Sequence, residues 1–148
     1  MKVTRTIETW GDAHHPKILD IIRLLLGAFL FIKGLVFLNH FPFLRELIIS
    51  TKALSFSPDT ITLLIYYVTF VHMLGGFLIF LGLLTRVSAL VQLPVVFAAV
   101  FFVNILNPYF NSELWLSVLV LALLVLFVVI GSGPLSVDRF LRNIRDNN

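Results

Sequence analysis

Four long apolar runs dominate this sequence and restrict its fold more than any other feature. They extend over Ile18–Leu38, Ile61–Leu84, Val87–Leu106 and Leu114–Ile130. Each has about 17 to 24 residues, and an α-helix of that length crosses a hydrocarbon core of roughly 30 Å. Because a backbone in lipid must satisfy its own hydrogen bonds, and the runs lack the alternation of barrel strands, they predict transmembrane helices. We therefore expect an all-α membrane protein, a four-helix transmembrane bundle.

The composition supports this fold class and excludes several others. Of the 148 residues, 59% are hydrophobic and only 13% are charged, whereas soluble domains have about 25% charged residues. The 8 acidic and 11 basic side chains cannot cover the surface of a water-soluble domain of this length. With no cysteine, the sequence offers no disulfide scaffold, thiolate nucleophile or iron–sulfur ligand.

The basic residues predict the orientation of the bundle. One side would hold seven of them, Lys2, Arg5, Lys17, Arg86, Arg139, Arg142 and Arg145, and the other only Arg45 and Lys52. By the positive-inside rule, both termini lie in the cytoplasm. We expect a cytoplasmic segment over residues 1–17, a transmembrane domain over 18–140 and a cytoplasmic tail over 141–148. Basic residues at membrane edges indicate contact with lipid headgroups, and we expect no nucleic-acid partner.

The segment Phe41–Phe56 differs from the tight turns that join the other runs. Its apolar positions recur at helical spacing, at Leu44, Leu47, Ile48, Thr51 and Leu54. This pattern predicts a short amphipathic helix between the first and second spans, lying on the outer membrane face. The alternative is a lid over a pocket between the helices.

Charged side chains inside the first run are costly if they face lipid, so the side of the helix from which they point is informative. Asp20 and Arg23 share one stripe with Gly27 and Gly34. Glycines allow helices to approach closely, so this stripe is expected to be buried, with Asp20 and Arg23 forming an ion pair. Lys33 lies off the stripe, where it either reaches the outer headgroups or contacts a ligand.

His72 is the main polar candidate of the second run. It shares a helical face with Gly75 and Gly76, which predicts that it points into the bundle. Such a histidine is either a hydrogen-bonded packing residue or a group that binds a quinone carbonyl or relays a proton. Asn104 and Glu113 lie at similar depth and could share a polar pocket. The histidines are not spaced for a metal site, so we expect none.

Two motifs resemble the DoxX family. The run His72–Arg86, with its three glycines, resembles the centre of that family, and Gly131–Asp138 is similar to its glycine-x-glycine…serine-x-aspartate ending. Arg23 and the glycines of its stripe fit the first helix of the family. The resemblance covers roughly residues 18–140.

The resemblance implies four transmembrane helices in a bacterial cytoplasmic membrane. The family includes a subunit of a thiosulfate:quinone oxidoreductase and membrane partners of redox-defence complexes. His72 departs from the family pattern, which usually has an acidic residue there. Arg86 and Asp138 match the pattern, and we expect them to pair at the cytoplasmic face and tie the second hairpin to the tail.

These observations support three hypotheses about function. The first is an integral membrane subunit of a quinone-linked redox or oxidative-stress assembly, with quinone as the ligand and a redox enzyme or a second copy as partner. His72, Glu113, Tyr66, Asn104 and Lys33 would then contact an apolar ligand between the helices. The second is a non-catalytic membrane scaffold. The third is a small oligomeric transporter, which the few inward charges support poorly. No residue is assigned a catalytic role.

Overall fold

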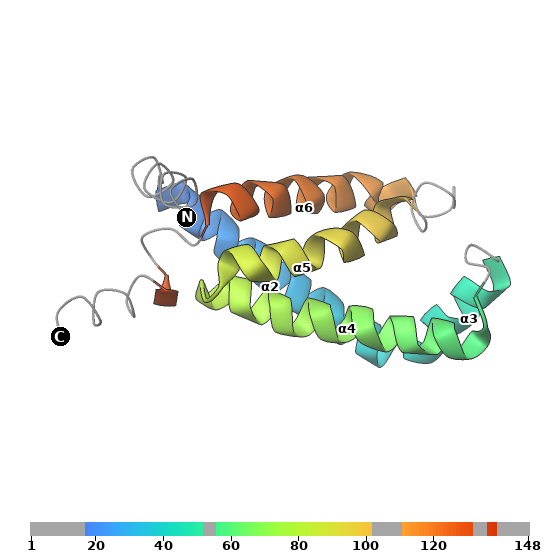
Figure 1. Ribbon diagram of the computed structural model, residues 1–148. Coiled ribbons are helices and arrows are strands. Elements are labelled where there is room, and N and C mark those ends of the chain that lie inside the picture. The colour runs from blue at the N-terminus through green and yellow to red at the C-terminus, as the bar shows by residue number, and fades with distance from the viewer. Residues whose placement is uncertain (1–16, 52–55, 102–110, 132–135, 139–148) are drawn as a thin grey trace.

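The computed structural model describes residues 17–51, 56–101, 111–131 and 136–138 (Figure 1). These residues form the helices α2 (Lys17–Asn39), α3 (Phe41–Thr51), α4 (Pro58–Leu81), α5 (Thr85–Ala98) and α6 (Asn111–Ile130). After α5 the helix widens into a π-helical turn over residues 99–101. The described part of the chain contains no strand, so the predicted all-helical class is confirmed.

The long helices run antiparallel in chain order (Figure 1). α2 packs mainly on α4, α5 packs mainly on α6, and α4 and α5 join the two pairs. At one end of the bundle α2 and α5 begin while α4 and α6 end, and we call this the Asp20 end. The opposite end, where α3 lies against the start of α4, is the α3 end.

The outside of the bundle is strongly apolar. α2 and α4 contain segments, Ile18–Asn39 and Pro58–Leu81, that are long and apolar enough to cross a membrane, and shorter apolar helices extend over Thr85–Phe101 and Leu114–Ile130. Many large apolar side chains of these helices point outward, and Trp115 is 81% exposed. An apolar outer surface of this extent is unfavourable in water and favourable in lipid. The fold is therefore consistent with a membrane helical bundle.

Glycines bring α2 and α4 into close contact. A Cβ on Gly76 would lie 2.5 Å from the backbone nitrogen of Phe31, and one on Gly27 would meet the backbone of Phe80. The two backbones therefore touch where each helix lacks a side chain, which is the small-residue packing of membrane helices. The glycine stripes predicted to face neighbouring helices do so.

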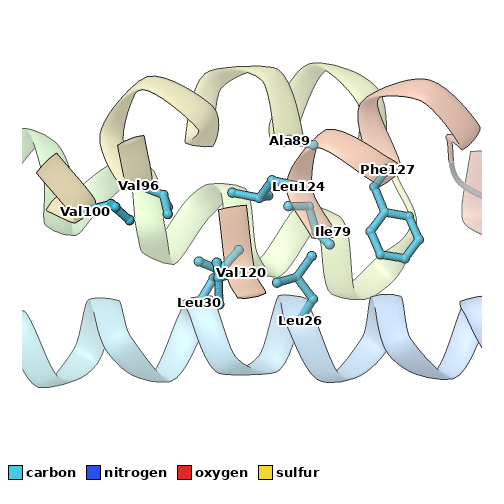
Figure 2. Close-up of a cluster of buried hydrophobic side chains, with 9 residues drawn as sticks. All are labelled: Leu26, Leu30, Ile79, Ala89, Val96, Val100, Val120, Leu124 and Phe127. Atoms are coloured by element: carbon cyan, nitrogen blue, oxygen red, sulfur yellow. The ribbon is translucent and has the colours of Figure 1, made fainter. Parts of the chain in front are cut away.

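A single apolar cluster fills the space between the four long helices (Figure 2). Its side chains come from α2, α4, α6 and the α5 segment, and all are less than 6% exposed: Leu26, Leu30, Ile79, Ala89, Val96, Val100, Val120, Leu124 and Phe127. Figure 2 shows them pointing toward one another across the bundle. This cluster separates the polar groups of the Asp20 end from the α3 end.

The turn between α4 and α5 lies earlier in the chain than the sequence predicted. The hydropathy pattern placed it at Thr85 and Arg86, but α4 ends at Leu81, and both of those residues belong to α5. Gly82 has φ 69° and ends the helix, with Gly82 N donating to Ile79 O. The left-handed backbone of a glycine stops a helix even where the following residues are apolar.

Candidate functional site

A polar cluster occupies the Asp20 end. Asp20 and Arg23 are 0% and 1% exposed, and Arg23 Nη1 lies 3.5 Å from Asp20 Oδ1. The three-residue spacing that predicted an ion pair therefore does bring the two charges together, one helical turn apart. The pair lies within the bundle and not at its surface.

The α4–α5 turn packs directly on this ion pair. A Cβ on Gly82 would lie 2.7 Å from Arg23 Nη1 and 2.8 Å from Ser136 Cβ. Asp138 N donates to Gly82 O over 3.3 Å, and the Asp138 carboxylate acts electrostatically on Arg23. Asp20, Arg23, Gly82, Ser136 and Asp138 form what we call the Asp20-end cluster, which joins α2, the turn and the segment after α6.

Arg86 connects the start of α5 to the end of α6. Its Nη2 donates to Val129 O and Ile130 O, each over 3.3 Å. Gly131, with φ 89°, lets the guanidinium approach, since a Cβ there would lie 2.8 Å from Arg86 Nε. A cation at free helix-terminal carbonyls is favourable. The direct pair of Arg86 with Asp138 remains a prediction.

A row of buried polar side chains runs along α5. Thr85, Ser88 and Gln92 are 1%, 4% and 0% exposed, and their spacing of three and four residues places them on one face. Gln92 Nε2 donates to Val71 O over 3.1 Å, and its amide covers Gly75 of α4. We call these three residues the α5 polar row.

His72 lies on α4 against α2. It is 6% exposed, its ring centroid is 5.6 Å from that of Phe37, and Nδ1 lies 3.1 Å from Val68 O. Lys33 is close enough to act electrostatically on the imidazole. The Lys33 ammonium also lies 5.7 Å from the centre of the Phe29 ring. α2 and α4 thus place the two candidates Lys33 and His72 within electrostatic reach of each other.

A hollow of about 420 Å³ lies beside α3. It is lined by Phe41, Pro42, Arg45, Glu46 and Ile49. α3 is attached here to the first turns of α4, because Arg45 Nε donates to Thr62 Oγ1 over 2.9 Å. The predicted short helix is therefore present and packs on the bundle.

Comparison with family models identifies one match. The DoxX model matches residues 18–105, more than half of the chain. The chain belongs to the DoxX family. The comparisons with curated proteins and with solved structures give no match. The family match supports the resemblance inferred from the motifs, and together with the apolar helices it indicates a membrane protein.

In this DoxX-family chain the predicted ligand contacts do not all gather at one place. Tyr66 is 53% exposed and stacks on Phe41 with ring centroids 4.5 Å apart. It precedes His72 by six residues, about 9 Å along the helix, and lies on another face of α4. Glu113 lies in the first turn of α6. The Glu113 side chain and all of Asn104 lie outside the described residues.

Sequence reasoning missed the α5 polar row of this DoxX-family protein. The available signal was a polar residue at positions i, i+3 and i+7 within an otherwise apolar run. Among the residues described, no three His, Cys, Asp or Glu side chains are grouped as a metal site would require.

Proposed function

We propose that this DoxX-family chain is a multi-pass subunit of a quinone-linked redox or oxidative-stress assembly in the bacterial cytoplasmic membrane. In this proposal it binds a quinone or a similar apolar ligand where α2 meets α4. Family membership and the apolar outer surface support the membrane setting. The four apolar helices would each span the bilayer, with both termini in the cytoplasm.

The geometry of His72 carries the proposal. A carbonyl oxygen only accepts hydrogen bonds, so the contact between Nδ1 and Val68 O places a hydrogen on Nδ1. In a neutral imidazole, Nε2 is then an acceptor. Within the described part of the chain, Nε2 makes no hydrogen bond. An acceptor without a hydrogen-bond partner, on an imidazole that is only 6% exposed, is suited to a ligand that brings a donor.

The chemistry around His72 defines the ligand more closely. An Nε2 acceptor calls for a hydroxyl, which a reduced quinone offers and an oxidised quinone does not. Phe37 supplies an aromatic surface beside the imidazole, and Lys33 supplies a positive charge nearby. An apolar ring system with a hydroxyl group, such as a quinol, matches this combination.

Ligand titration of the purified protein in lipid nanodiscs tests this function. We expect a quinol analogue to bind and His72→Leu to weaken binding roughly tenfold, the effect of losing one hydrogen bond of about 1.4 kcal/mol. Tyr67→Phe is the matched control, because Tyr67 lies on the same helix, is 52% exposed and has no predicted ligand contact, and it should bind like wild type. Melting temperatures of both variants check folding.

The outcomes separate the hypotheses. If wild type binds no quinol and no quinone co-purifies with it, the ligand-binding function is wrong. If wild type binds and His72→Leu binds equally well, the site lies elsewhere. If the redox assembly keeps its full enzymatic activity with His72→Leu and holds no quinone, this chain is instead a non-catalytic scaffold of that assembly.

A further inference from the structure

The hollow beside α3 has a cation and an anion in its wall. It has a volume of about 420 Å³ and is lined by Phe41, Pro42, Arg45, Glu46 and Ile49, which all belong to α3. Sites for small molecules and cofactors usually have volumes of about 300–1,000 Å³. The α3 hollow therefore has room for a polar group of several atoms, bordered by apolar side chains.

The two charged side chains of the hollow do not neutralise each other. Consecutive residues of a helix do not face one another, and within the described part of the chain Glu46 forms neither an ion pair nor a hydrogen bond. Arg45 Nε donates to Thr62 Oγ1 over 2.9 Å. This bond positions the guanidinium and leaves both of its Nη groups for a ligand. The Glu46 side chain is exposed, so it is accessible as well.

This pair of charges defines the class of ligand. A guanidinium binds phosphate, and a carboxylate binds an ammonium group. A ligand with only a phosphate would be repelled by Glu46, and a ligand with only an amine would be repelled by Arg45. A zwitterion with a phosphate and an ammonium group a few atoms apart matches both side chains at once.

The apolar surface beside the hollow indicates that this zwitterion is a lipid. α2 ends and α4 begins at the α3 end, so the headgroup layer of a bilayer crossed by these helices would lie at the level of α3. Phe41 stacks on Tyr66 of α4. The same face of α4 continues with Phe70 and Phe77, which are 64% and 48% exposed. This aromatic row runs away from the hollow along the bundle, as an acyl chain would.

We propose that the α3 hollow binds a phospholipid whose headgroup joins a phosphate to a primary ammonium, as in phosphatidylethanolamine. Arg45 donates to the phosphate, Glu46 accepts from the ammonium, and an acyl chain packs on the aromatic row. The primary ammonium has hydrogens to donate, whereas the trimethylammonium of phosphatidylcholine has none and phosphatidylglycerol has no cation. This lipid site stands apart from the proposed quinol site, and either can be present without the other.

Native mass spectrometry of the detergent-purified protein measures the binding of each lipid. The protein is titrated with phosphatidylethanolamine, phosphatidylcholine and phosphatidylglycerol that have the same acyl chains. We expect phosphatidylethanolamine to bind roughly tenfold more tightly than the other two, the effect of one hydrogen bond between charged groups. Any other order of affinities, including equal binding, would overturn the assignment.

A pair of matched substitutions links this preference to the hollow. Glu46→Gln should bring phosphatidylethanolamine down to the affinity of phosphatidylcholine, because the charge that attracts the ammonium is lost. Asp59→Asn is the control, because Asp59 is also exposed near the α3 end but does not line the hollow. It should keep the wild-type preference, and melting temperatures check that both variants fold. An unchanged preference in Glu46→Gln, or an equal loss in both variants, would contradict the site.

Arg45→Gln tests the phosphate contact, and it should weaken all three lipids several-fold because each contains a phosphate. Arg45 also attaches α3 to Thr62 of α4, so a second variant separates the two roles. Thr62→Val removes this attachment and keeps the guanidinium, and we expect it to retain more lipid binding than Arg45→Gln. Equal losses in the two variants would show that Arg45 holds α3 in place and does not bind the phosphate.

Discussion

Gly75 and Gly76 are neighbours in the sequence but differ in what surrounds them. A Cβ on Gly76 would meet the backbone of Phe31 at 2.5 Å, whereas the three atoms nearest to a Cβ on Gly75 all belong to the side chain of Gln92, the first at 2.9 Å. A backbone held in a helix cannot move aside without displacing the helix, while a side chain can rotate. The same substitution should therefore have different costs at the two positions.

We expect Gly76→Ala to destabilise the protein by about 1–3 kcal/mol, the usual cost of overpacking a tight contact. Gly75→Ala should cost less, because the gain in helix propensity of about 1 kcal/mol offsets the movement of Gln92. Thermal unfolding of both variants in the same lipid measures the difference. Equal destabilisation would show that α2 and α4 are not in backbone contact at Gly76.

His72 and Lys33 show what residue patterns can and cannot predict. Helical periodicity predicted that His72 points into the bundle, because a face shared with glycines meets a neighbouring helix, and the 6% exposure of His72 agrees with this. The same reasoning did not reveal the bond to Val68 O, which decides whether Nε2 donates or accepts. That choice depends on the side-chain rotamer, which hydropathy does not contain.

At the scale of elements, the hydropathy pattern predicted the apolar runs and two of their ends well, but it misplaced the turn between α4 and α5. α2 begins at Lys17 and α6 ends at Ile130, within one residue of the predicted bounds. The α4–α5 turn was misplaced because Gly82 lies between apolar residues, and a left-handed backbone angle changes no hydropathy value. Helix ends are decided by backbone geometry and capping, which composition reflects weakly.

The Arg86 contact also illustrates a limit of charge patterns. The sequence predicted that Arg86 ties the second hairpin to the tail through Asp138. That pair stays a prediction, while two hydrogen bonds from Arg86 Nη2 reach the carbonyls of Val129 and Ile130. Backbone carbonyls at a helix terminus are acceptors that a count of charged side chains overlooks.

We expect Arg86→Ala to lower stability by about 1 kcal/mol, because the final carbonyls of α6 lose a cationic donor that is partly exposed to solvent. The loss of stability should be larger in the last turn of α6 than in the protein as a whole. Hydrogen–deuterium exchange should rise in the last turn of α6 and stay unchanged at Leu124. Arg86→Lys keeps the charge and serves as the control, and equal exchange in both variants would contradict the capping role.

At the scale of the whole molecule, the apolar outer surface is the feature that the sequence predicted best. A count of charged residues already excluded a water-soluble domain. The bundle then places large apolar side chains outside, such as Leu63 and Phe70 at 70% and 64% exposure. The predicted orientation of the bundle in a membrane rests only on the distribution of basic residues.

Single-cysteine labelling tests that orientation, since the sequence contains no native thiol. Asp59 lies exposed near the start of α4 at the α3 end, and Val137 lies at the Asp20 end. We expect a membrane-impermeant maleimide to label Asp59→Cys in cells whose inner membrane is intact, and to label Val137→Cys only after permeabilisation. The opposite pattern would reverse the predicted topology.

The packing of Gly82 has a practical consequence for protein engineering. Fusion tags and reporter domains are usually inserted into short connections between helices, because loop tips tolerate added residues. The connection at Gly82 does not offer such a tolerant site, because Arg23 and Ser136 leave no room for even one additional carbon. A more suitable insertion point is the exposed residue Phe56, which precedes Ser57, the N-cap of α4. A split reporter or affinity label placed there would leave the junction of α4 and α5 intact.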